Sequence, residues 1–115
     1  MTDSTNDRAT FEALKESAGG EFVLELVDTF LAEAPVMLAD LRSALAANDA
    51  DRFRRAAHSL KSNSMTFGAL ALGEMARSLE LGGIGPVQQA GGAPLDRLAE
   101  EYARAAKTLS ELRNA

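Results

Sequence analysis

The 115-residue chain contains no cysteine and only one histidine. Without cysteine it can form neither a disulfide framework nor a thiolate metal site, and one histidine cannot supply a cluster of imidazole ligands. Long apolar runs are also missing, because none approaches the roughly 18 residues that a membrane-spanning helix needs. The sequence therefore predicts a protein with no disulfide framework, no thiolate or histidine-cluster metal site and no membrane partner.

Positive charge is scarce, since 12 lysines and arginines face 17 aspartates and glutamates, which gives a formal net charge of −5. Affinity for nucleic acid comes mainly from accumulated positive charge, so we expect no nucleic-acid partner. The polar start of the chain lacks the apolar stretch of an export signal, which favours a cytoplasmic location. We expect one domain over residues 1–115, in which residues 1–9 form a flexible N-terminal segment.

Apolar residues recur at helical spacing along almost the whole chain, and no segment alternates as a half-buried strand would. The expected helices are separated by glycine, proline or short polar breaks. They cover residues 10–17, 21–32, 35–47, 51–67, 69–81 and 94–113. The sequence therefore predicts an all-α protein.

Some details of this pattern stay open. Pro35 either separates two helices or lies within one kinked helix. Asp49 or Asp51 caps the helix that follows. The glycine-rich stretch over residues 82–92 is either a mobile loop or flanks a short turn at 87–90. In the last helix, steps of three and four residues predict a bundle seam formed by Leu95, Leu98, Tyr102, Ala105, Leu109 and Leu112.

The only histidine, His58, is predicted to lie on the outside of its helix. On a wheel of about 100° per residue, it lies about 140° from Phe53, which faces inward. The inward stripe of this helix comprises Phe53, Ala57, Leu60 and Ser64. An imidazole outside that stripe is open to a docking partner, so His58 is a candidate nucleophile.

Positive charge gathers around His58. Four of the chain's twelve cations fall within ten residues: Arg52, Arg54, Arg55 and Lys61. Residues three or four positions away are neighbours on a helix surface, so we expect a positive patch around the imidazole. Nearby cations disfavour the imidazolium form and leave a ring nitrogen with a free lone pair. The same cations would offset the charge of a phosphoryl group on the ring.

Glu80 is a candidate orienting group for His58. If the two helices turn near residue 69, His58 and Glu80 each lie eleven residues from the turn and stand at the same height. A Glu80 carboxylate that accepts from Nδ1–H would leave Nε2 unprotonated. Spacing alone does not set the direction of the side chain, and the alternative is an ion pair with Arg77, three residues earlier.

The segment around His58 resembles the signature of histidine phosphotransfer (HPt) domains of two-component phosphorelays, H-x-L-K-G-x5-G. Here it reads His58-Ser59-Leu60-Lys61-Ser62, followed after five residues by Gly68. The flanking residues 30–35 and 79–80 are also similar, and the resemblance covers nearly the whole chain. It implies an antiparallel four-helix bundle with an additional short N-terminal helix.

The resemblance also implies a function. His58 would accept a phosphoryl group from the aspartyl phosphate of a receiver domain, or from a kinase, and pass it to another receiver aspartate. Lys61 would contact the phosphoryl oxygens. Ser62, where the family most often has glycine, would be the small residue that admits the receiver. The partners would be response-regulator receiver domains or a hybrid histidine kinase. Mg²⁺ would lie on the receiver side, so the chain would have no metal or other cofactor of its own. It would act as a monomer without kinase activity of its own.

Two other functions stay open. The phosphoacceptor and dimerisation domain of a sensor histidine kinase typically has an acidic residue directly after the histidine and a proline four positions further on. Ser59 and Asn63 occupy those positions here, and no nucleotide-binding half follows. The other alternative is a helical-bundle scaffold that binds other proteins and in which His58 is incidental.

Overall fold

Helices make up nearly all of residues 8–114, the part of the chain that the computed structural model describes. They are α1 (Arg8–Ala18), α2 (Gly20–Ala47), α3 (Ala50–Thr66), α4 (Leu70–Gly82), α5 (Ile84–Gln89) and α6 (Ala93–Asn114). No strand occurs in the described residues, so the prediction of an all-α protein is confirmed. Residues 1–7 of the predicted flexible segment lie outside the described residues, and residues 8 and 9 already belong to α1.

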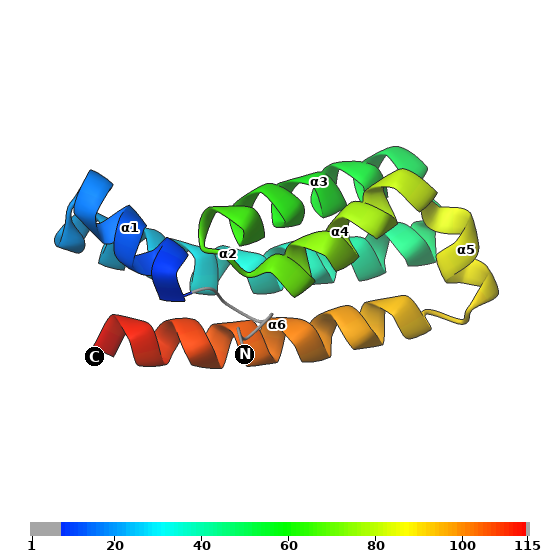
Figure 1. Ribbon diagram of the computed structural model, residues 1–115. Coiled ribbons are helices and arrows are strands. Elements are labelled where there is room, and N and C mark those ends of the chain that lie inside the picture. Colours follow the sequence, from blue (N-terminus) through cyan, green and yellow to red (C-terminus); the bar gives the residue numbers. More distant parts are fainter. Residues whose placement is uncertain (1–7, 115) are drawn as a thin grey trace.

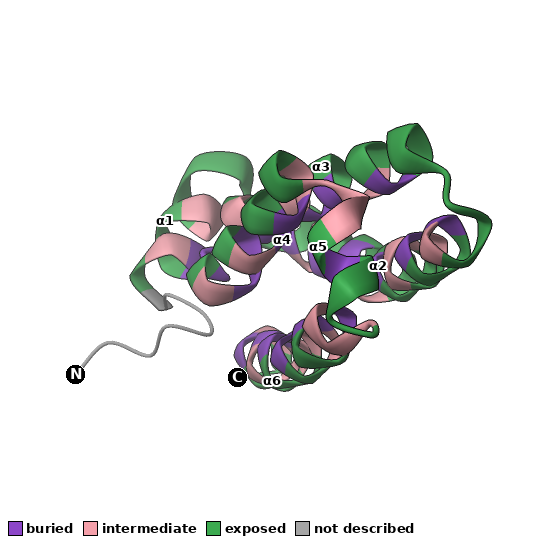
Figure 2. Ribbon diagram, turned by 90° about the vertical axis from the view of Figure 1, so that its right-hand side faces the viewer, coloured by how far each residue is buried: buried purple, intermediate pink, exposed green. Residues whose placement is uncertain are grey.

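The four long helices α2, α3, α4 and α6 form an antiparallel bundle (Figure 1). Helix α3 packs between α2 and α4, and α6 closes the bundle by contacting both of these helices. The short α1 packs on α2 at one end. Figure 2 shows the buried residues on the faces that the long helices turn toward one another. The predicted four-helix bundle with a short N-terminal helix is therefore confirmed.

Helix α2 runs without a break from Gly20 to Ala47, with Pro35 inside it. Proline has no N–H, so it cannot donate to the carbonyl of Leu31, its partner four residues earlier in an α-helix. The hydroxyl of Tyr102 on α6 donates to that carbonyl instead, at 3.3 Å. The ring of Tyr102 also packs edge-on against Phe30, with 6.0 Å between the ring centroids. A neighbouring helix thus satisfies the acceptor that the proline leaves unpaired.

Helix α3 presents the inward stripe that its sequence predicts. Phe53, Ala57, Leu60 and Ser64 are all buried. The helix is capped by Asp49, whose carboxylate accepts from the main-chain N–H of Arg52 at 3.1 Å, so Asp49 rather than Asp51 is the cap. Gly68 follows the helix with φ of +71°, a left-handed conformation that favours glycine and turns the chain into α4.

A close approach between α3 and α4 fixes their relative position. A Cβ atom at Gly73 would lie 2.8 Å from the terminal methyl of Met65, closer than van der Waals contact allows. Glycine at this position therefore leaves the space that Met65 occupies. Met65 and Gly73 lie the same number of residues before and after residue 69. His58 and Glu80 are also equidistant from residue 69, so both pairs follow one alignment of α3 with α4.

The glycine-rich stretch contains α5, which covers the open end of the bundle between α4 and α6 (Figure 1). Val87 is buried. The side-chain amide of Gln88 donates to the side-chain oxygen of Asn48 at 2.8 Å, which ties α5 to the turn between α2 and α3. The structure therefore supports the short-turn alternative, with a helix that begins three residues before the predicted position.

The seam of α6 differs from the prediction at one place. Glu101 is buried, at 6% exposure, whereas Tyr102 is half-buried. Both Nε and Nη2 of Arg104 donate to Oε1 of Glu101, at 3.1 and 2.8 Å. The other oxygen, Oε2, is buried and has no hydrogen-bond partner among the described residues. Either residue 101 or residue 102 gives steps of three and four between Leu98 and Ala105. The prediction placed Tyr102 in the seam because its side chain is more apolar than that of Glu101, whereas the structure buries Glu101 more deeply.

Candidate functional site

His58 lies on the outer face of α3, as the wheel predicts, and its side chain is 54% exposed. Its Nδ1 atom lies 2.7 Å from Oε2 of Glu80, across the contact between α3 and α4. The height alignment that the turn predicts therefore brings the two side chains together. Arg77, the alternative partner of Glu80, lies 4.0 Å from Glu74 instead.

Glu80 joins His58 to Lys61. Its second oxygen, Oε1, lies 3.2 Å from Nζ of Lys61, and its side chain is only 15% exposed. The hydrogen bond from His58 lowers the pKa of Glu80 below its ordinary value, against the opposing effect of desolvation, and Lys61 lowers this pKa further. The carboxylate is therefore charged at neutral pH and can act only as an acceptor.

This geometry selects one tautomer of the neutral imidazole. Because Glu80 can only accept, His58 donates its proton from Nδ1, and the lone pair lies on Nε2. Within residues 8–114, Nε2 has no hydrogen-bond partner. The site therefore combines an oriented ring, an available nitrogen lone pair and a charged amine beside it, which are the parts that a nucleophile needs for attack on an electrophilic phosphorus.

Ser62 lies one helical turn after His58 and is exposed. Its main-chain carbonyl accepts from the hydroxyl of Thr66 at 3.1 Å. Its short side chain adds little bulk to the surface beside the imidazole. Of the four predicted site residues, three are joined by direct contacts, and Ser62 is their neighbour on the helix surface.

The positive patch predicted around His58 needs correction. Arg54 and Arg55 both pair with Asp51, at 2.9 and 3.2 Å, and Arg52 pairs with Asp40 of α2 at 2.7 Å. With Lys61 beside Glu80, each of the four cations has a carboxylate partner, and the surface alternates in charge. Asp51 lies on α3 itself, at helical spacing from both of its partners, and the prediction did not take it into account. Asp40 and Glu80 come from α2 and α4, which a wheel of one helix could not show.

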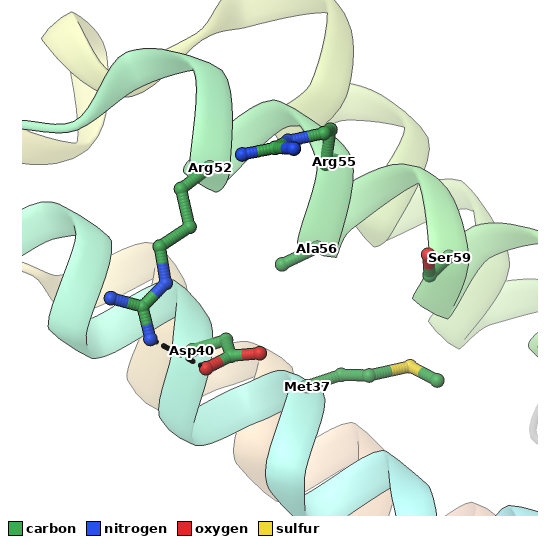
Figure 3. Close-up of a pocket in the computed structure, with 6 residues that line it drawn as sticks. All are labelled: Met37, Asp40, Arg52, Arg55, Ala56 and Ser59. Atoms are coloured by element: carbon green, nitrogen blue, oxygen red, sulfur yellow. Dashed lines mark hydrogen bonds and ion pairs between the residues drawn. The ribbon is translucent and has the colours of Figure 1, made fainter.

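A groove between α2 and α3 escaped the sequence analysis. It has a volume of about 380 Å³ and is open to solvent (Figure 3). Its lining residues are Met37, Asp40, Arg52, Arg55, Ala56 and Ser59. Ser59 directly follows His58, so the groove begins beside the candidate nucleophile. Only the pairing of the two helices brings these residues together, and the sequence pattern did not specify that pairing.

Metal sites and membrane-spanning helices were also considered for residues 8–114. Among residues 8–114, no three histidine, aspartate or glutamate side chains are grouped so that they could hold a metal ion. None of the helices in the same range combines the length and the apolar character needed to cross a bilayer.

Comparison with known proteins finds a matching family and a similar crystal structure. The Hpt domain family matches residues 25–115. The crystal structure of histidine-containing phosphotransfer protein B (HptB) from Pseudomonas aeruginosa PAO1 is similar, with a TM-score of 0.85 and 28% sequence identity over 96% of this chain and 95% of that chain. No curated protein matches the chain.

Proposed function

This chain belongs to the Hpt domain family, as a histidine phosphotransfer protein of phosphorelays, and from that premise we propose that His58 carries the phosphoryl group. One observation carries this proposal: the only histidine of the chain is exposed, with Nδ1 bound to Glu80 at 2.7 Å. That contact leaves the lone pair on Nε2, the ring nitrogen that a partner can reach.

In the proposed reaction, Nε2 attacks the phosphorus of an aspartyl phosphate on a receiver domain. The N–P bond forms as the P–O bond to the aspartate breaks, and the carboxylate leaves with the bonding electron pair. The imidazole ring gains positive charge because Nδ1 keeps its proton. The carboxylate of Glu80, already 2.7 Å from Nδ1, offsets that charge. The reverse sequence transfers the group to the next receiver aspartate.

Lys61 and Ser62 have distinct roles in this proposal. Lys61 contacts the phosphoryl oxygens and neutralises part of their charge, which its place beside Glu80 supports. Ser62 admits the receiver, because a short side chain one turn from His58 lets the partner approach closely. Phosphoryl transfer depends mainly on such positioning and charge neutralisation.

The proposed partners are response-regulator receiver domains, which supply the aspartates and the Mg²⁺ that the transfer needs. A hybrid histidine kinase is a further proposed donor. The chain would act as a monomer, because one copy contains all the residues that the proposed site requires. The cytoplasm is its proposed location, on the basis of the sequence.

Incubation with a phosphorylated receiver tests the proposal. The wild-type chain is expected to gain an acid-labile, base-stable label, and His58→Gln is expected to gain none while its circular dichroism stays unchanged, because the site is exposed. A labelled His58→Gln variant would show that another residue accepts the group. A wild-type chain that stays unlabelled with every receiver would favour the scaffold alternative.

A further inference from the structure

The two sides of α3 next to His58 differ in character. Toward α4, the surface carries side chains that already pair with one another, namely Lys61 with Glu80 and Arg77 with Glu74. Toward α2, the surface is hollowed into the groove of about 380 Å³ that begins at Ser59 (Figure 3). A protein that covers His58 can therefore insert a side chain into the groove on the α2 side.

The groove combines apolar and cationic parts. Ala56 and Met37 form apolar surface between the helices. At one end of the groove Arg52 reaches across to Asp40, and Arg55 lies above Ala56 (Figure 3). Methionine is unbranched and polarisable, which suits it to contact with varied apolar groups. The lining includes two guanidinium groups and one carboxylate, that of Asp40, because Asp51, the partner of Arg55, lies outside it. The lining residues by themselves therefore carry a net positive charge, although the chain has a net charge of −5.

The arginine side chains can change partners at small cost. Arg55 and its partner Asp51 are 67% and 64% exposed, and Asp51 also pairs with Arg54. Exposed ion pairs contribute little to stability because water screens both charges. A carboxylate that enters the groove can therefore bind Arg55 without breaking a strong interaction, and Arg54 remains to pair with Asp51.

We propose that this α2–α3 groove determines which receiver domains the protein accepts, by binding an acidic side chain that lies beside an apolar one on the receiver surface. The inference rests on the proposed function, which requires a receiver to cover His58 and hence Ser59 at the start of the groove. The guanidinium groups recognise the carboxylate, and Met37 and Ala56 contact the apolar neighbour. Receivers that present a basic side chain at this place are rejected by repulsion.

Charge reversal at two adjacent arginines tests the groove. Arg55→Glu changes a lining residue, whereas Arg54→Glu makes the same change one position earlier, at a residue that shares Asp51 but does not line the groove. His58 of each variant is first loaded with phosphoramidate, which needs no receiver. Transfer is then followed against the concentration of the receiver that unloads the wild-type protein fastest, chosen from the receivers of the source organism.

The expected result is a rise of about tenfold or more in the half-saturating receiver concentration for Arg55→Glu, with an unchanged limiting rate, and a change within about twofold for Arg54→Glu. A lysine in place of one acidic residue on the receiver surface should restore binding to Arg55→Glu. Equal effects of the two variants, or a loss confined to the limiting rate, would overturn the inference and leave the proposed function intact.

Two other outcomes would also overturn it. If Arg55→Glu dissociates a dimer of the wild-type chain in sedimentation, a second copy rather than a receiver occupies the groove. If phosphoramidate loads His58 but no receiver removes the group from the wild-type protein, the proposed relay function fails, and the inference fails with it. Because phosphoramidate loads His58 without a receiver, unloading of the wild-type protein tests the relay. The comparison of the Arg55 and Arg54 variants then tests the groove.

Discussion

The hydroxyl of Tyr102 donates a hydrogen bond to the main-chain carbonyl of Leu31, 3.3 Å away on another helix. This carbonyl is the one that Pro35 leaves without its usual N–H partner. A proline inside a long helix is therefore compatible with an unbroken α2, because α6 supplies a donor at the same height. The interaction also links two helices of the bundle by a contact that neither sequence segment predicts alone.

Removing the hydroxyl tests this link. Tyr102→Phe is expected to lower the free energy of unfolding by about 1 kcal/mol, because the carbonyl of Leu31 loses its donor. In a Pro35→Ala background the loss should be smaller, since alanine restores the N–H. Urea denaturation of the four proteins in a double-mutant cycle measures the difference. Equal losses in both backgrounds would show that the tyrosine and the proline act independently.

The Glu80 carboxylate predicts a pH dependence of stability. Its pKa in the folded protein lies below the ordinary value of 4.5, chiefly because His58 donates to it. A lowered folded pKa contributes stability that is present above pH 4.5 and is lost as the pH falls through the folded pKa. The stability difference between wild type and Glu80→Gln should therefore be steady above that pH and shrink below it. Denaturation from about pH 6 to about pH 3 measures it, and parallel curves would contradict the role of the carboxylate.

Lys61→Ala tests the proposed phosphate contact. A hydrogen bond to a charged group is worth enough that its loss should slow transfer, or shorten the lifetime of the phosphorylated protein, by about tenfold. The matched control is Lys107→Ala, which removes an exposed lysine from α6, away from His58. Decay of the label after loading with phosphoramidate gives the lifetime. If both variants behave as the wild type does, Lys61 is a solvated surface charge.

The contact between Met65 and Gly73 predicts non-additive stabilities. Gly73→Ala favours the helical state of α4 by about 1 kcal/mol, but its new methyl group displaces the end of Met65. In a Met65→Ala background that displacement is absent, so the same change should stabilise more than it does in the wild type. Chemical denaturation of the single and double variants gives the coupling. Additive effects would show that Met65 moves aside without cost.

The sequence predicted the parts of the site that lie on one helix or symmetrically about one turn. Helical periodicity placed His58 about 140° from Phe53, outside the inward stripe, and counting from residue 69 placed Glu80 at the same height as His58. These predictions depend only on regular helix geometry and on the position of the turn. The structure agrees with both. The direction of the Glu80 side chain toward His58, which gives the 2.7 Å contact, did not follow from spacing and is seen only in the structure.

Features that join helices distant in sequence could not be predicted in this way. The Asp40–Arg52 pair and the groove beside it depend on the relative rotation of α2 and α3, which many side chains set together. Glu101 illustrates a second limit: the spacing allowed it in the seam of α6, but a carboxylate is seldom buried, and Tyr102 was the more apolar choice. At this position the prediction followed the polarity of the side chains, because the spacing did not distinguish the two residues.

The shared register of the His58–Glu80 and Met65–Gly73 pairs constrains the length of the hairpin. One residue inserted into or deleted from α3 after His58, or α4 before Glu80, would turn one partner by about 100° around its helix and shift it along the axis by about 1.5 Å. The ring would then lose its acceptor and could rotate freely. Changes of length within these two helical segments are therefore incompatible with the contact between His58 and Glu80.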